Sequence, residues 1–89
     1  MEKETRVAVI STVIESEEAV EDINGLLHAY SDFIIGRMGV PYRKKGINVI
    51  TVVLDAPPDA ISALSGKLGR IRGVTSKVLY AKNTKTDPQ

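Results

Sequence analysis

Cysteine is absent from the 89 residues, which excludes disulfides and thiolate metal sites. The chain has a single histidine, His28, and one imidazole without cysteine is a poor basis for a transition-metal site. We therefore predict that the protein holds no metal and no other cofactor. No apolar run approaches the roughly 20 residues of a membrane helix. The charged segment Met1–Arg6 lacks the pattern of a secretory signal peptide, so we expect a cytoplasmic protein without a membrane partner.

The same shortage of reactive residues argues against catalysis. No set of serine, histidine and aspartate can be assembled with any specificity into a nucleophilic triad. Several carboxylates gather between Glu15 and Asp22, but they fall at the predicted start of a helix, where the helix dipole favours negative charge. We therefore predict no catalytic residues, and an enzymatic role ranks below regulation and protein binding.

Charge is distributed unevenly along the chain, although the net charge is only +1. Residues 1–36 contain two basic and eight acidic side chains, which gives −6. Residues 37–89 contain ten basic and three acidic side chains, which gives +7. Such a dipolar chain favours self-association or an acidic partner, although two solvated faces of opposite sign produce the same distribution.

Six segments alternate between the patterns of strands and helices. Runs of β-branched residues predict strands, and Ser16 and Pro58 are suited to the starts of two helices. The expected elements are a strand at 6–14, a helix at 17–30, a strand at 33–40 closed by Pro41, a strand at 47–54, a helix at 58–72 and a strand at 74–81. This βαββαβ order predicts a ferredoxin-like α+β fold, a four-stranded antiparallel sheet with two helices on one face.

The second predicted helix combines an apolar stripe with glycines. Ile61, Leu64, Leu68 and Ile71 recur at helical spacing, and Gly73 is placed as the left-handed residue of a Schellman motif in which Val74 packs on Leu68. Small residues gather on the opposite side of the helix, and we predict that they form an interface: Ser62, Ser65, Gly66 and Gly69. We expect a Gly66→Leu substitution to preserve the monomer fold but to weaken assembly or partner docking.

The first and third strands are apolar on both faces. Val7, Val9 and Val13 alternate with equally apolar neighbours, and the third strand repeats this pattern. A sheet covered by helices on one face only should instead alternate apolar and polar residues. The simplest cover for the second face is another copy of the sheet, so we predict a homo-oligomer.

RNA-recognition motifs share this fold, but they stack bases on aromatic residues of the central strands. The first and third strands here contain no aromatic residue. Arg37 and the basic turn Arg43–Lys45 offer cations to phosphates, yet without stacking partners a solvated turn is the simpler interpretation. We do not expect a nucleic-acid partner.

Four segments carry a resemblance to a known family: Ile23–His28, Arg37–Pro41, Ala63–Gly69 and Gly73–Val74. In these segments the chain resembles the iron-only hydrogenase system regulators, small ACT-like proteins related to the C-terminal domain of nickel-responsive regulators. The resemblance implies an oligomeric, ACT-like regulatory module. We expect residues 1–82 to form a single ACT-like domain and residues 83–89 to form a flexible tail.

The chain departs from its wider relatives in two ways. Nickel-responsive regulators hold nickel with several histidines and a cysteine, so nickel sensing by that site is not expected here. Amino-acid-binding ACT domains commonly place a glycine in the loop between the first strand and helix. This loop reads Glu15-Ser16-Glu17, which argues against amino-acid binding.

The resemblance also implies where a small-molecule effector would bind, at a subunit interface near the second strand and the first strand–helix loop. Glu15, Ser16 and Arg37 are the candidate ligand-binding residues. Arg37 interrupts an otherwise apolar strand, either to meet an anionic group or to protect an edge strand from aggregation. Our leading hypothesis is a non-enzymatic regulatory module, active as a dimer or tetramer. The alternative is a protein-interaction module without a small-molecule ligand.

Overall fold

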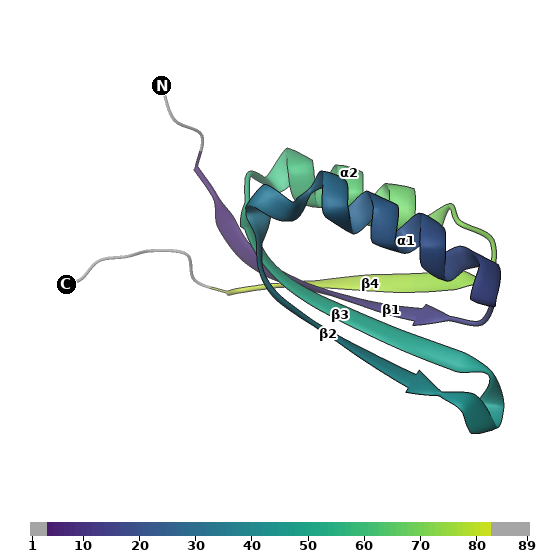
Figure 1. Cartoon of the computed structure of the whole chain (residues 1–89). Coiled ribbons are helices and arrows are strands. Elements are labelled where there is room, and N and C mark those ends of the chain that lie inside the picture. The colour runs from purple at the N-terminus through teal and green to yellow at the C-terminus, as the bar shows by residue number, and fades with distance from the viewer. Residues whose placement is uncertain (1–3, 83–89) are drawn as a thin grey trace.

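The computed structural model describes residues 4–82, which form four strands, two α-helices and two short 3₁₀ helices (Figure 1). In chain order these are β1 (Arg6–Ile14), α1 (Glu17–Ala29), η1 (Ser31–Phe33), β2 (Ile34–Tyr42), η2 (Arg43–Lys45), β3 (Ile47–Ala56), α2 (Pro58–Gly69) and β4 (Val74–Tyr80). The predicted tail at 83–89 lies outside the described residues.

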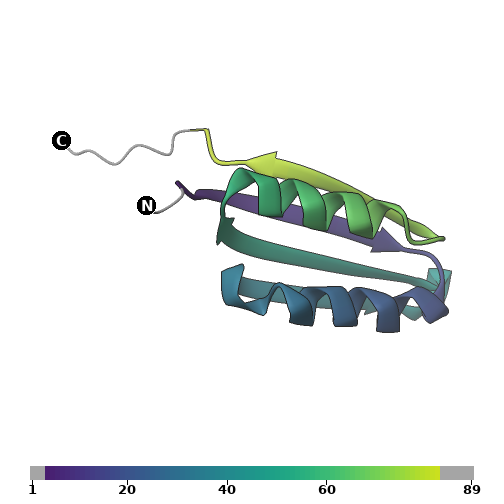
Figure 2. The ribbon, with the colours of Figure 1, turned by 90° about the horizontal axis from the view of Figure 1, so that it is seen from above.

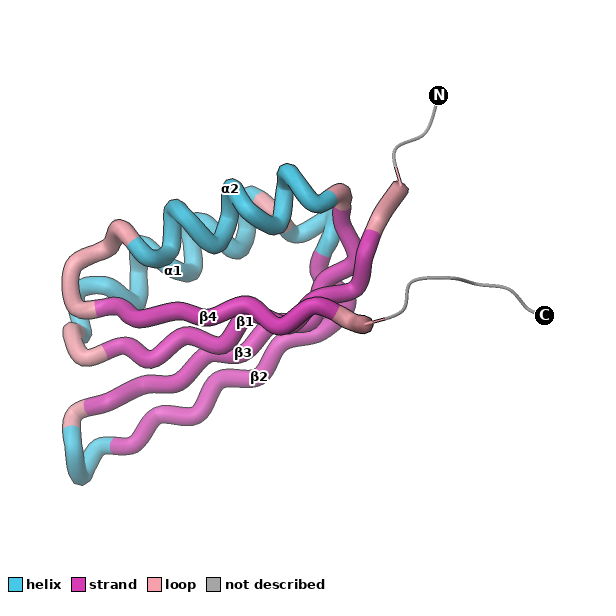
Figure 3. Tube along the Cα trace, turned by 180° about the vertical axis from the view of Figure 1, so that it is seen from behind, coloured by secondary structure: helices cyan, strands magenta, loops and turns pink. Residues whose placement is uncertain are grey.

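All strand pairs are antiparallel, and the sheet order is β2-β3-β1-β4. Both helices lie on one face of the sheet, and nothing in the described chain covers the other face (Figures 1 and 3). Seen from above, α1 lies over the β2 side of the sheet and α2 over the β4 side (Figure 2). The predicted ferredoxin-like α+β fold is therefore confirmed.

The hydrophobic core lies between the helices and the sheet. It is built from every second residue of the two central strands, because successive strand residues point to opposite faces, and from one apolar stripe of each helix. The buried apolar residues are Ala8, Ile10, Ile14, Ala19, Ile23, Leu27, Ile50, Val52, Leu54, Ala56, Ile61, Leu64 and Leu68.

The second helix is shorter than the sequence predicted, ending at Gly69 instead of Arg72. Ile71 packs against the core, as the apolar stripe suggested, but it does so from the turn after the helix. Gly73 has the expected positive φ of 81°, yet it lies four residues beyond Gly69. A hydrogen bond from the Val74 N–H to the Ile71 carbonyl, 3.2 Å long, closes a separate turn there. The predicted Schellman motif at Gly73 is therefore wrong.

The second strand differs from its prediction at both ends. It begins after η1, and it continues through Pro41 to Tyr42. Proline, which has no N–H to donate, is tolerated because β2 is an edge strand. An irregularity between Ile34 and Gly36 leaves Ile35 without a partner on β3, as in a β-bulge.

Candidate functional site

Arg37 lies in a hollow between α1 and β2. It pairs with Val52 of β3, whose side chain is buried beneath the helices, so the Arg37 side chain also points to the helix side. Its Nη2–H donates a 2.8 Å hydrogen bond to Oδ1 of Asn24 on α1. The hollow has a volume of about 310 Å³ and is lined by Asn24, Leu27, His28, Ser31, Ile34 and Arg37.

Each of the four polar side chains that line this hollow can donate a hydrogen bond, and Arg37 can only donate. None of the lining residues is acidic, and Arg37 forms no ion pair within residues 4–82. Its neighbours Asn24, His28 and Ser31 are exposed, whereas Leu27 is buried and Ile34 half-buried. The arrangement suits a small group that has one negatively charged end and one apolar part.

The other two predicted ligand residues lie elsewhere. Glu15 and Ser16 follow Ile14, which pairs with Asn48 of β3, four residues along that strand from the partner of Arg37. Four strand residues span about 13 Å, and β2 is two strands away from β1. One chain therefore does not bring Arg37 together with Glu15 and Ser16, and a shared ligand role for the three stays a prediction.

The Glu15–Ser16 loop contacts the turn after α2. The Glu15 N–H donates a 2.8 Å hydrogen bond to the Gly73 carbonyl. Ser16 precedes α1 with extended backbone, as the sequence predicted for a capping position, but its side chain makes no capping hydrogen bond. The contact joins the start of α1 to the start of β4.

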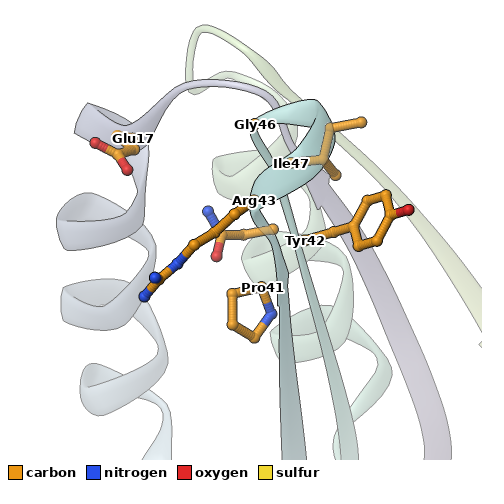
Figure 4. Close-up of a pocket in the computed structure, with 7 residues that line it drawn as sticks. Glu17, Pro41, Tyr42, Arg43, Gly46 and Ile47 are labelled. Carbon is orange, nitrogen blue, oxygen red and sulfur yellow. The ribbon is translucent and has the colours of Figure 1, made fainter.

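Sequence analysis did not predict a second hollow, of about 380 Å³, between the start of α1 and the β2–β3 hairpin (Figure 4). Arg43 extends from the hairpin toward α1, where Glu17 lies, while the ring of Tyr42 points away (Figure 4). The only signal for it in the sequence was the basic turn Arg43–Lys45. Charges of both signs line the hollow, so it does not select a ligand of one sign.

The predicted interface residues lie on α2, away from its buried stripe. Ser62, Gly66 and Gly69 are exposed, and Ser65 is half-buried. Gly66 lies in the helix interior, but Gly69 is its last residue, where a glycine interrupts the helix less than the sequence suggested. Whether this patch contacts another protein stays a prediction.

Gly66→Ala is expected to raise the free energy of unfolding by about 1 kcal/mol, because alanine is the better helix former by that amount. An added Cβ would meet no atom within 4 Å. For a chain of this size the melting temperature should rise by about 4–8 °C. Thermal unfolding followed by circular dichroism measures the change, with Gly69→Ala at the helix end as the weaker control. An unchanged or lower melting temperature would contradict the prediction.

The face of the sheet opposite the helices is apolar and uncovered. On β1 and β3 the strand register directs to it the side chains of Val7, Val9, Val13, Ile47, Val49 and Val53. The edge strands add Met38, Val40, Tyr42 and Leu79. We call this surface the open face. At its centre the Ser11 and Thr51 hydroxyl oxygens lie 3.5 Å apart. The predicted apolar character of both faces is confirmed, while the predicted cover by a second copy is not tested.

Within residues 4–82, no group of three or more histidine, aspartate or glutamate side chains is placed to hold a metal ion. Neither α-helix described there has the length and apolar character that crossing a membrane requires.

Comparison with known proteins identifies a family. The TM1266-like family, described as "Iron-only hydrogenase system regulator, putative", matches residues 6–78. The solved structure of the uncharacterized protein TM1266 from Thermotoga maritima is similar, with 40% sequence identity and a TM-score of 0.85. The similarity covers 89% of this chain and 100% of that one. No curated protein matched. The resemblance read from the sequence is confirmed, and the chain belongs to the TM1266-like family.

Proposed function

We propose that this protein is a non-enzymatic, ACT-like regulatory module that acts in the cytoplasm as a homodimer and responds to a small-molecule effector. The two copies pack through their open faces, so that the sheets lie against each other and the helices lie outside. The observation that carries the proposal is the uncovered apolar surface of the sheet. Family membership supports the regulatory role.

The size of the open face supports a partner of matching apolar character. Val7, Val13, Met38 and Val40 each expose between 38% and 60% of their surface, and Leu79 exposes 69%. Monomeric proteins rarely expose apolar patches larger than a few hundred Å² unless the patch binds something. A chain of 89 residues also has a small core, which a second sheet would enlarge.

The distribution of charge on the open face favours a second copy as the occupant. The strand register places only Asp55 and Lys77 there as charged side chains of β1 to β4. Because these two charges have opposite signs, the open face has no net charge from them, and two copies of it do not repel each other. A twofold axis makes such a face self-complementary, as in the commonest class of protein oligomer.

Light scattering coupled to gel filtration tests the assembly on the unmodified protein. We expect a mass of two 9.7 kDa chains, or four if dimers pair further, over a dilution series. A single-chain mass throughout the series would overturn the homodimer. The uncovered face would then favour the alternative function, a protein-interaction module whose partner supplies the missing apolar layer.

A further inference from the structure

We propose that the hollow between α1 and β2 binds a small organic carboxylate with a short apolar chain, and that Arg37 holds the carboxylate group. The inference rests on the proposed regulatory function, because it names the chemical class of the effector. Its starting point is a guanidinium group without an acidic partner in the described chain, beside a hollow lined by donors and two apolar side chains.

The hydrogen bond to Asn24 joins the two side chains and leaves most donors of Arg37 free. A guanidinium group has five N–H donors, and the bond to Asn24 Oδ1 uses one of them. Because Oδ1 faces Arg37, the amide N–H₂ of Asn24 is left to donate to another acceptor. Arginine binds a carboxylate with two parallel hydrogen bonds, which the planar guanidinium of Arg37 can still supply.

The remaining lining residues define the rest of the ligand. Ile34, which is half-buried, offers apolar surface for a short hydrocarbon group, whereas Leu27 exposes only 2% of its surface. The Ser31 hydroxyl can donate a further hydrogen bond. A cationic ligand would meet Arg37 without any compensating carboxylate in the lining. The site therefore favours a ligand that carries a negatively charged group at one end only.

A carboxylate suits this site better than a phosphate. The hollow lies at the C-terminal end of α1, with His28 in the last turn, and the partial negative charge of that helix end opposes a doubly charged anion more than a singly charged one. The lining contains one arginine and no lysine, whereas phosphate sites gather several cations or backbone N–H groups.

The site and the open face share β2 but lie on opposite sides of the sheet. Arg37 points to the helix side, and the next residue, Met38, points to the open face, where it pairs with Thr51. A ligand at Arg37 thus leaves the proposed dimer surface free. It also contacts the strand that contributes Met38 and Val40 to that surface.

Titration with isobutyrate, followed by amide chemical shifts in two-dimensional NMR, tests the proposal. We expect saturable shifts at Asn24, His28, Ile34 and Arg37 at millimolar concentrations. Isobutyramide, which has the same shape without the charge, should shift these resonances at least about tenfold more weakly, because hydrogen bonds to charged groups are the stronger ones. Inorganic phosphate is the third probe. Equal or tighter binding of phosphate would overturn the assignment to a carboxylate.

Variants locate the binding. Arg37→Ala should weaken isobutyrate binding by at least about tenfold through loss of the charged hydrogen bonds. Arg43→Ala removes the same charge from the β2–β3 hairpin and should leave the affinity unchanged. Asn24→Asp places a carboxylate at the present partner of Arg37, so the internal ion pair should compete with the ligand and abolish measurable binding. Equal losses for Arg37→Ala and Arg43→Ala would indicate attraction by net charge only and overturn the site.

Light scattering on the same samples separates this inference from the proposed function. A dimer that shows no isobutyrate shifts would overturn the effector site but not the assembly. A monomer that binds isobutyrate through Arg37 would support the site and overturn the homodimer. The circular dichroism spectrum of Arg37→Ala shows whether its fold is intact. The variant Arg37→Lys keeps the positive charge but loses the planar guanidinium group, so it should bind isobutyrate with intermediate affinity.

Discussion

Replacing Gly73 with alanine is expected to lower the free energy of unfolding by roughly 2–4 kcal/mol, with two physical causes. The backbone at Gly73 has φ = 81°, a left-handed conformation that costs an L-residue about 1–2 kcal/mol. A Cβ at this position would also lie 2.9 Å from the Cβ of Ser16. Neither Cβ can rotate away, so the backbone itself would have to move.

Gly46→Ala provides a matched control for this prediction. Gly46 also has a positive φ, 64°, but an added Cβ would meet nothing within 4 Å. Its substitution should cost only the conformational part, about 1–2 kcal/mol. Urea unfolding of both variants measures the difference. Equal costs at the two positions would show that the contact with Ser16 contributes nothing, and the Ser16→Gly background, which removes one of the two Cβ atoms, should recover part of the loss at Gly73.

The Gly73 contact also changes the interpretation of the first strand–helix loop. The Gly73 carbonyl accepts the hydrogen bond from the Glu15 N–H, and the glycine leaves just enough space for Ser16. The loop of Glu15 and Ser16, which we predicted to form part of a ligand site, is thus held in place by its contact with the start of β4. This accounts for a small residue at position 16 without a ligand.

Most of the fold could be predicted because the need to bury apolar side chains determines where apolar residues occur in the sequence. Runs of β-branched residues identified β1 and β3, and the helical spacing of Ile61, Leu64 and Leu68 identified α2. The same rule misplaced the end of α2, since Ile71 continues the helical stripe but reaches the core from a turn. The spacing of apolar residues indicates which side chains are buried. It does not indicate which backbone hydrogen bonds hold those side chains in the core.

The surroundings of Arg37 could not be predicted, although the residue itself stood out. Its direction depends on the irregularity at Ile35, which has no clear signal in the sequence. In a regular ladder Gly36 would pair with Val52, and Arg37 would pair with Thr51 on the open face. The one-residue shift instead turns Arg37 toward α1. Its partner Asn24 lies thirteen residues earlier, and only the tertiary structure brings the two together.

Val13→Asp is expected to raise the dissociation constant of the proposed homodimer by at least about 100-fold, because a carboxylate without a partner would be buried in each copy. Val13 lies on the central strand β1, points to the open face, and pairs there with Val49 and Thr75. It is 38% exposed in the single chain, so we expect the folded monomer to lose only about 1 kcal/mol through lower β-propensity. Light scattering measures the mass, and circular dichroism measures the fold.

Two controls separate the effect of charge at the open face from other causes. Val13→Thr keeps the shape and β-propensity without adding charge, so its dimer should weaken far less. Ala63→Asp adds the same charge to an exposed position of α2, on the helix side of the sheet, and should leave the dimer unchanged. An unaltered dimer in Val13→Asp would exclude the open face as the interface. If Gly66→Leu dissociated that dimer instead, the contact would lie on the small-residue patch of α2, and the open face would be left for a different partner.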